Sequence, residues 1–151
     1  MSINSHKELV AEIKIFADKM ELINDFKYLK DTEKIIDEVN ISEPRVLVLG
    51  VDSVSFDDEN YNQVMTYSFL MADETIYDTD SVINSEEENI FCVSSLADYL
   101  KYISDSQIEL QNISLLTEQV GEGVFTSISG KFEFIIKRSP SYWKKMEEYN
   151  V

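Results

Sequence analysis

The chain has 151 residues, of which 44% are hydrophobic and 11% aromatic, and it carries a formal net charge of −16. The length predicts one domain over residues 1–151 with a real hydrophobic core, and the apolar content excludes a disordered acidic tail. No apolar run reaches the roughly 20 residues of a membrane-spanning helix, the single cysteine (Cys92) excludes an internal disulfide, and the negative charge argues against binding to a phosphate backbone.

The first element that the sequence predicts is an amphipathic helix of about five turns. Ser5 followed by Glu8 fits a capping box. Apolar residues then recur at three- and four-residue spacing, namely Leu9, Val10, Ile13, Phe16, Met20 and Ile23. We expect this stripe to pack on a sheet, because it is too short for a coiled coil. The pattern weakens over residues 26–43, where Asp31 or Thr32 could cap a short helix.

A pair of strands follows Pro44. Residues 45–56 read as a strand whose first half, Val46–Leu49, is apolar on both faces and should therefore be covered on both. After the polar turn Asp57–Asn62, a second strand places four apolar side chains on one face: Met65, Tyr67, Phe69 and Met71. The short turn between two such runs predicts an antiparallel hairpin.

A loop and a second helix come next. We expect a loop over Asp73–Asn84 and a helix that begins with Ser85 as its cap. Glu86, Glu87 and Glu88 would then lie in the first turn, where the helix dipole favours anions. The predicted buried stripe of this helix consists of Val93, Leu96, Leu100 and Ile103.

A second hairpin of strands Gln107–Leu116 and Val124–Lys137 follows, joined around Gly121–Gly123. In the first of these strands the apolar parity changes, which predicts a bulge near Gln111–Asn112. Along the last strand we expect Val124, Ile128, Phe132, Phe134 and Ile136 to face inward and Ser127, Ser129, Lys131, Glu133 and Lys137 outward, with a bend at Gly130. Residues 139–151 form a short aromatic tail, expected to be helical, with Tyr142, Trp143, Met146 and Tyr149.

The order of elements is thus helix, hairpin, helix, hairpin and tail. Hairpin connections imply antiparallel pairing, and two amphipathic helices suffice to cover one face of a sheet. We therefore predict an α+β fold with an antiparallel sheet of about four strands, two helices packed on one face, and a long C-terminal hairpin.

The residue types that carry catalysis or bind metal ions are not grouped in any motif. Cys92 lies inside the second predicted helix and His6 at the start of the first, so a Cys–His nucleophile is not expected. Residues from Asp78 to Asn89 begin like a calcium loop, but Ile83 replaces the required glycine and Asn89 the final glutamate. We predict that the chain is not an enzyme, has no metal site and uses no cofactor.

The acidic residues are concentrated in one stretch, with twelve acidic and no basic side chains between Val46 and Leu100. The candidates for facing a channel or a partner are Asp57, Asp58, Glu59, Asp73, Glu74, Asp78 and Asp80. Three interpretations stay open: solvated loops that keep the protein soluble, a surface for a basic partner, or the lining of a passage for a polyanion. A stretch without basic side chains suits a passage, because even a few lysines would bind phosphates.

This order of elements resembles the tail terminator, or tail-completion, proteins of tailed bacteriophages and related head–tail ring proteins. The resemblance covers roughly residues 5–138. It rests on the N-terminal helix, the strand after Pro44, the strand Met65–Asp73, the acidic loop, the helix through Phe91–Tyr102 and the closing strand around Ser129–Phe134. A strand ending in Ala-Asp, then a polar loop and a Ser-capped helix, is similar to versions from crAss-like phages.

The resemblance implies a structural virion protein, assembled in the host cytoplasm, whose subunits form a six- or twelve-fold ring at the phage neck or tail end. Its partners would be itself and other neck or tail proteins, with no membrane, and DNA would pass through the hole without specific binding. Tyr142, Trp143, Met146 and Tyr149 are the candidate subunit contacts. The alternative is an acidic cytoplasmic adaptor or DNA-mimic inhibitor that binds a basic protein.

Overall fold

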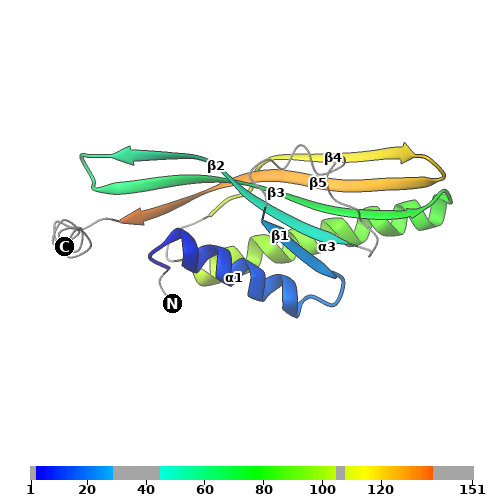
Figure 1. The fold of residues 1–151 in the computed structure, drawn as a ribbon, viewed down its shortest axis with the longest axis horizontal. Helices are drawn as coiled ribbons and strands as arrows, with labels where there is room; N and C mark the ends of the chain where they lie inside the picture. Colours follow the sequence, from blue (N-terminus) through cyan, green and yellow to red (C-terminus); the bar gives the residue numbers. More distant parts are fainter. Residues whose placement is uncertain (1–2, 29–44, 105–107, 138–151) are drawn as a thin grey trace.

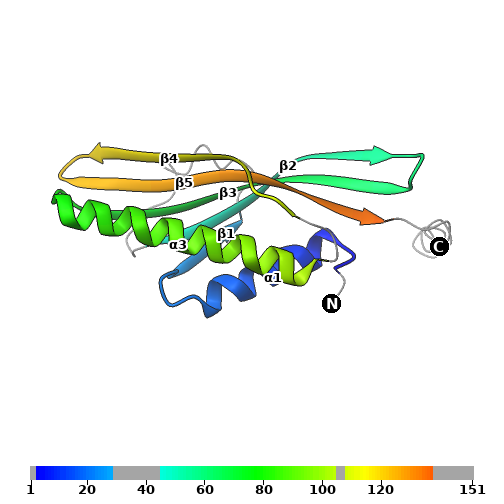
Figure 2. The same cartoon turned by 180° about the vertical axis from the view of Figure 1, so that it is seen from behind.

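The computed structural model describes residues 3–28, 45–104 and 108–137, which form two helices and one five-stranded sheet (Figures 1 and 2). The elements in chain order are α1 (His6–Lys19), β1 (Asp25–Tyr28), β2 (Val46–Asp57), β3 (Asn62–Ile76), α3 (Thr79–Ile103), β4 (Gln111–Val120) and β5 (Gly123–Lys137). The predicted α+β class is therefore confirmed.

The sheet has the strand order β1-β2-β3-β5-β4. The pairs β2–β3 and β4–β5 are antiparallel, as the two predicted hairpins require. The pair β3–β5 is also antiparallel, whereas β1 pairs with β2 in parallel. Strand β1 was not predicted, because its four residues are exposed or half-buried and give no apolar alternation. Both helices lie on the same face of the sheet (Figure 2).

The main core fills the space between the helices and this face of the sheet. The alternating residues Met65, Tyr67, Phe69 and Met71 of β3 are all buried there, as predicted. Opposite them lie Leu9, Ile13 and Phe16 of α1 and Val93, Leu96, Leu100 and Ile103 of α3. Two amphipathic stripes therefore bury one face of a sheet, which is the standard way to close an α+β core.

A second, smaller apolar cluster lies on the opposite face of the sheet. It consists of Val46, Val48, Ala72 and Phe125, with Leu70 packed against it. The prediction that Val46–Leu49 is covered on both faces is confirmed, since all four residues are buried. Ser127 lies on the face away from the helices, as predicted, but it is buried there and not exposed to solvent.

Helix α1 begins as its sequence predicts. The Ser5 hydroxyl accepts a hydrogen bond from the backbone N–H of Glu8 at 3.1 Å, and the Glu8 carboxylate accepts one from the backbone N–H of Asn4 at 2.9 Å. The helix ends at Lys19, earlier than the five turns we expected, and Ile23 reaches the core from the connection to β1.

Helix α3 begins earlier than predicted. Strand β3 continues to Ile76 and α3 starts at Thr79, so the expected loop over Asp73–Asn84 is wrong. The helix cap is Asp78, whose carboxylate accepts hydrogen bonds from the backbone N–H and the hydroxyl of Ser81 at 3.1 and 3.0 Å. The sequence thus offers two possible N-caps, Asp78 and Ser85, and the helix begins after the earlier one.

Ser85, the expected cap, lies in the interior of α3 and is buried. Its hydroxyl donates to the Asp73 carboxylate at 2.7 Å. Glu86, Glu87 and Glu88 therefore do not lie in the first turn, and the explanation of these carboxylates by the helix dipole is wrong.

The bulge predicted near Gln111–Asn112 is confirmed. The register of β4 against β5 shifts between Gln111 and Ser114, and Asn112 has a φ of 55°. The strand itself begins at Gln111 instead of Gln107.

Gly130 is required by packing. It pairs with Phe69 on the helix-covered face, where an added Cβ would lie 2.6 Å from Cδ1 of Ile113 and 2.8 Å from Cζ of Phe69. The predicted length of the last strand, to Lys137, is also confirmed.

The sheet is elongated, and the β2–β3 hairpin extends past both helices together with the end of β5 (Figure 1). We call residues 53–64 and 135–137 the arm. Its exposed apolar side chains are Val54, Phe56, Tyr61 and Ile135. The other end of the sheet carries the start of α3 and the β4–β5 turn.

Candidate functional site

The candidate acidic residues lie at two opposite ends of the molecule. Asp57, Asp58 and Glu59 form the tip of the arm, and Glu74, Asp78 and Asp80 lie where β3 leads into α3. Strand β3, which joins the two groups, has 15 residues, and at about 3.3 Å per residue it spans about 45 Å. The structure therefore does not bring the predicted acids together on one surface.

At the arm tip, Asp57 organises the turn. Its carboxylate accepts hydrogen bonds from the side-chain amide of Asn60 at 2.9 Å and from the backbone N–H groups of Glu59 and Asn60 at 3.2 and 3.3 Å. These hydrogen bonds, the Asn60 side chain first, hold the pKa of Asp57 below its ordinary value. One of the three tip carboxylates thus has a structural role.

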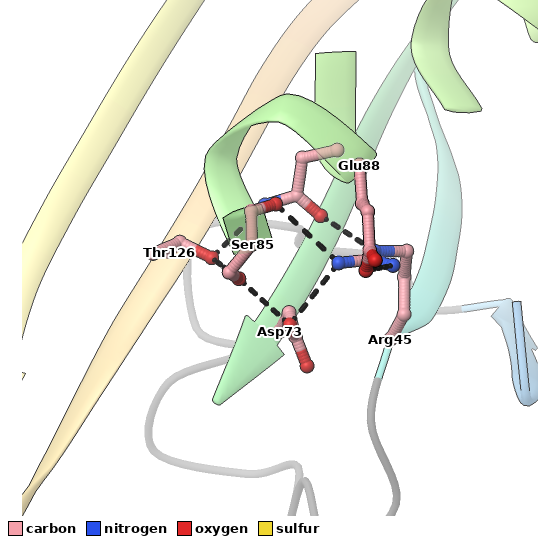
Figure 3. Close-up of polar contacts among 6 residues, drawn as sticks. Arg45, Asp73, Ser85, Glu88 and Thr126 are labelled. Carbon is pink, nitrogen blue, oxygen red and sulfur yellow. Dashed lines mark hydrogen bonds and ion pairs between the residues drawn. The ribbon is translucent and has the colours of Figure 1, made fainter. Parts of the chain in front are cut away.

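Asp73 does not belong to any exposed acidic surface. Only 6% of this residue is exposed, and its carboxylate accepts hydrogen bonds from the Arg45 guanidinium at 3.1 Å and from the Ser85 hydroxyl at 2.7 Å (Figure 3). The proposal that Asp73 faces a channel or a partner is therefore wrong. The alternation of β3 turns this side chain to the helix-covered face, where α3 lies over it.

Arg45 is the centre of a buried polar cluster between β2, β3, β5 and α3. Besides Asp73, its guanidinium donates to the Glu88 carboxylate at 2.8 Å and to the Asn89 side-chain carbonyl at 2.9 Å. Thr126 of β5 completes the cluster, 2.5 Å from the Ser85 hydroxyl and 3.1 Å from the Asn89 amide. A guanidinium presents several donors in fixed directions and so can bind all these acceptors at once.

The Arg45 cluster has two features of a site under constraint. Arg45 itself adopts a φ of 68°, in the left-handed region that side chains rarely enter. Oδ1 of Asp73 is buried and has no hydrogen-bond partner among the described residues. Burial raises the pKa of the neighbouring Cys92 to about 11, the Arg45 charge opposes this effect and Glu88 adds to it. Cys92 is therefore a neutral thiol at physiological pH, which does not suit a nucleophile.

Sequence reasoning missed the Arg45 cluster, although one signal was present. Arg45 is the last basic residue before a long stretch that has none, and it directly precedes an apolar strand. A charged residue at the edge of a buried strand needs a buried partner. The sequence alone, however, gives no indication of which carboxylate that partner is.

His6 belongs to a separate cluster with two tyrosines. Its Nδ1 lies 2.7 Å from the Tyr67 hydroxyl and its Nε2 lies 3.2 Å from the Tyr28 hydroxyl. The rings of His6 and Tyr67 are stacked, and burial raises the pKa of both tyrosines. His6 thus ties α1 to β1 and β3, whereas Cys92 lies beside Arg45.

Strand β4 is the most exposed part of the sheet. All ten of its residues are exposed, and within the described part of the chain it pairs with β5 along one side only. Ile113 and Leu115 lie on the helix-covered side and Leu116 on the other side, so apolar groups are exposed on both faces. A long edge of this kind can add a strand from another chain.

The other predicted features concern the C-terminal tail, metal binding and membrane spanning. The tail residues Tyr142, Trp143, Met146 and Tyr149 lie outside the described residues. Within residues 3–28, 45–104 and 108–137, no group of three or more His, Cys, Asp or Glu side chains is placed to hold a metal ion. No helix of these ranges is long and apolar enough to cross a membrane.

Comparison with known proteins adds no family to this description. No protein-family profile matches the chain, and no curated protein matches it in sequence.

Proposed function

We propose that this chain is a structural subunit of a bacteriophage virion and forms a closed ring at the neck or tail end. The observation that carries the proposal is the edge strand β4, which is exposed at all ten positions and has apolar side chains on both faces. An edge strand in a soluble protein is normally covered, bulged away or charged. The bulge in β4 lies only at its start, between Gln111 and Ser114, so the rest of this edge stays open. A partner subunit that pairs with β4 would cover its free edge and prevent non-specific association.

The arm supports the same proposal. Its exposed apolar side chains, Val54, Phe56, Tyr61 and Ile135, lie beyond the helices that cover the rest of the sheet. A contact between different surfaces of identical subunits is head-to-tail, and it closes into a ring when the rotation between subunits allows. The arm and the β4 edge are two different surfaces on one subunit, as such a contact needs.

The acids at the arm tip suit a channel wall in this ring. Asp58 and Glu59 are exposed, and like charges around a hole would keep a passing DNA from adhering. The alternative, a DNA mimic, needs carboxylates spaced like phosphates along one face. The separation of the candidate acids into two groups about 45 Å apart does not favour it.

The ring is tested by electron microscopy of the purified full-length chain and by mass spectrometry of purified virions. We expect closed rings of six or twelve subunits and the chain among the neck or tail proteins. A chain that stays monomeric or dimeric and is absent from virions would overturn the proposal and favour the adaptor.

Reversing the charges at the arm tip tests whether the tip faces the channel. The double substitution Asp58→Lys, Glu59→Lys should give particles that assemble but eject DNA more slowly at low salt, with a defect that shrinks as salt rises. Glu87→Lys, Asp98→Lys is the matched control, because it changes the net charge equally on the exposed face of α3. Normal ejection by the first variant would show that the arm tip does not face the DNA.

A further inference from the structure

An apolar groove lies at the end of the sheet opposite the arm, between the start of α3 and strands β4 and β5. It has a volume of about 340 Å3, and its walls include Tyr77, Val82, Ile83, Thr117 and Val124. Tyr77 and Ile83 are 72% and 54% exposed, so both side chains are accessible to an occupant of the groove. The groove is at the lower end of the roughly 300–1,000 Å3 range of ligand pockets, enough for a large side chain.

The surroundings of the groove are acidic. Asp78 lines it directly, Asp80 lies in the same first turn of α3, and Glu86 accepts a hydrogen bond from the lining residue Thr117 at 2.6 Å. Because no Lys, Arg or His occurs between Val46 and Leu100, α3 brings no basic residue to this edge of the groove. An occupant with an apolar anchor and adjacent positive charge would therefore fit it.

The chain itself contains such a segment. Residues 138–151 hold the only tryptophan of the sequence, Trp143, directly after Tyr142 and directly before Lys144 and Lys145. Tryptophan and tyrosine are the side chains most often found as anchors in binding pockets. The segment thus combines an apolar anchor with two adjacent basic groups, which the groove would select, and carries Glu147 and Glu148 further from the anchor.

The geometry of β5 decides whether the segment can reach the groove of its own chain. Strand β5 runs from Gly123, paired with Ile76 beside the groove, to Lys137, paired with Asn62 in the arm (Figure 1). These 15 residues span about 45 Å. Trp143 is six residues beyond Lys137 and can lie at most about 22 Å from it. The groove of the same chain is therefore out of reach of Trp143.

We propose that the segment 138–151 of one subunit binds in the groove of the next subunit, with Trp143 as the anchor and Lys144 and Lys145 against Asp78 and Asp80. The inference rests on the proposed ring, because a contact between the arm end of one subunit and the groove end of another is head-to-tail. It assigns the groove its partner, which is a second copy of this chain.

Fluorescence gives a direct test, since Trp143 is the only tryptophan. The full-length variant Trp143→Ala is titrated with a synthetic peptide of residues 138–151, whose tryptophan emission should shift to shorter wavelength on binding. Adding Ile83→Glu, on the exposed side of α3, should weaken binding at least tenfold. A peptide with Lys144→Glu, Lys145→Glu should also bind at least tenfold more weakly, and Asp80→Lys in the protein should restore part of the loss. An unshifted emission at all concentrations would overturn the inference.

Mixing two variants tests the head-to-tail direction. Trp143→Ala lacks the anchor, Ile83→Glu lacks the groove, and each alone should sediment as a monomer. Their equimolar mixture has only one competent tail and one competent groove per pair, so it should give a 1:1 heterodimer and nothing larger. Oligomers of wild-type size from either variant alone would overturn the inference.

The two proposals can fail separately. Rings formed equally well by Ile83→Glu subunits would overturn the docking of the tail and leave the ring standing. Open filaments of wild-type chain that dissociate with the Ile83→Glu substitution, together with absence from virions, would support the docking and overturn the ring.

Discussion

The arm and the part of the sheet covered by α3 differ in which side chains they bury. The covered part buries charged groups, whereas the arm exposes apolar ones. Under α3 the molecule encloses a guanidinium and a carboxylate, Arg45 and Asp73, whereas the arm exposes Phe56 and Tyr61 to solvent. Enclosed charges are tolerated because each has a charged partner and neutral hydrogen bonds around it. Several exposed apolar side chains on one projecting segment are less usual on a monomer than single ones, and they can mark a contact surface. The buried ion pair therefore stabilises the subunit itself, whereas the exposed apolar side chains of the arm are available for contact with another subunit.

The largest effect is expected from breaking the enclosed ion pair. Arg45→Met should lower the free energy of unfolding by about 3–5 kcal/mol, because it leaves the Asp73 carboxylate buried without a cation. Lys131→Met is the control, since Lys131 pairs with Asp52 at 3.0 Å but is 48% exposed, and its loss should cost less than about 1 kcal/mol. Urea denaturation measures both, and equal costs would contradict the contrast between covered and exposed charge.

Gly130 tests the tight packing of the covered face. Gly130→Ala should destabilise the fold by about 1–3 kcal/mol, because the new Cβ would overlap Ile113 and Phe69. In the background of Ile113→Ala, the same substitution should cost less, since one of the two obstructions is gone. Thermal unfolding of the four variants of this cycle measures the coupling. A cost unchanged by Ile113→Ala would mean that Phe69 alone limits the space.

The start of α3, beside the groove, should be sensitive to its cap. Asp78→Ala is expected to cost about 1 kcal/mol and to remove the hydrogen-exchange protection of the Ser81 amide, which donates to Asp78. Asp78→Ser keeps an acceptor and should be nearly neutral. If the alanine variant leaves the Ser81 amide protected, another residue caps the helix.

The smallest expected effect is a change of stability with pH, caused by ionisation of the Cys92 thiol. Burial raises its pKa from 9.0 to about 11, so between these values the unfolded state loses the proton before the folded state does. The contribution of Cys92 to stability should therefore be constant below about pH 9 and fall as pH rises toward 11. Cys92→Ala should be less steep over this interval, although its overall stability is lower. Denaturation at pH 8, 9, 10 and 11 checks the slopes.

Several parts of the fold were predictable because they depend on local patterns. The alternation at Met65, Tyr67, Phe69 and Met71 fixed the buried face of β3, and the change of parity after Gln111 located the bulge in β4. Helix α1 followed from its stripe and its Ser5 cap. The predicted start of α3 was wrong. Asp78 and Ser85 are both good N-caps, and the local sequence does not show which of them begins the helix. Strand β1 had no pattern at all.

The sequence by itself determined the α+β class, the buried faces of β3 and β5 and the absence of basic groups from the middle of the chain. These follow from side-chain periodicity and composition, which are local properties. Only the tertiary structure decided which acids stay in solvent and where they lie. Asp73 and Asp57 look alike in the sequence, yet one pairs with Arg45 under a helix and the other closes a turn at the tip of the arm. The reason is that an ion pair depends on which residues the fold brings within a few ångströms, and Arg45 and Asp73 are 28 positions apart in the chain.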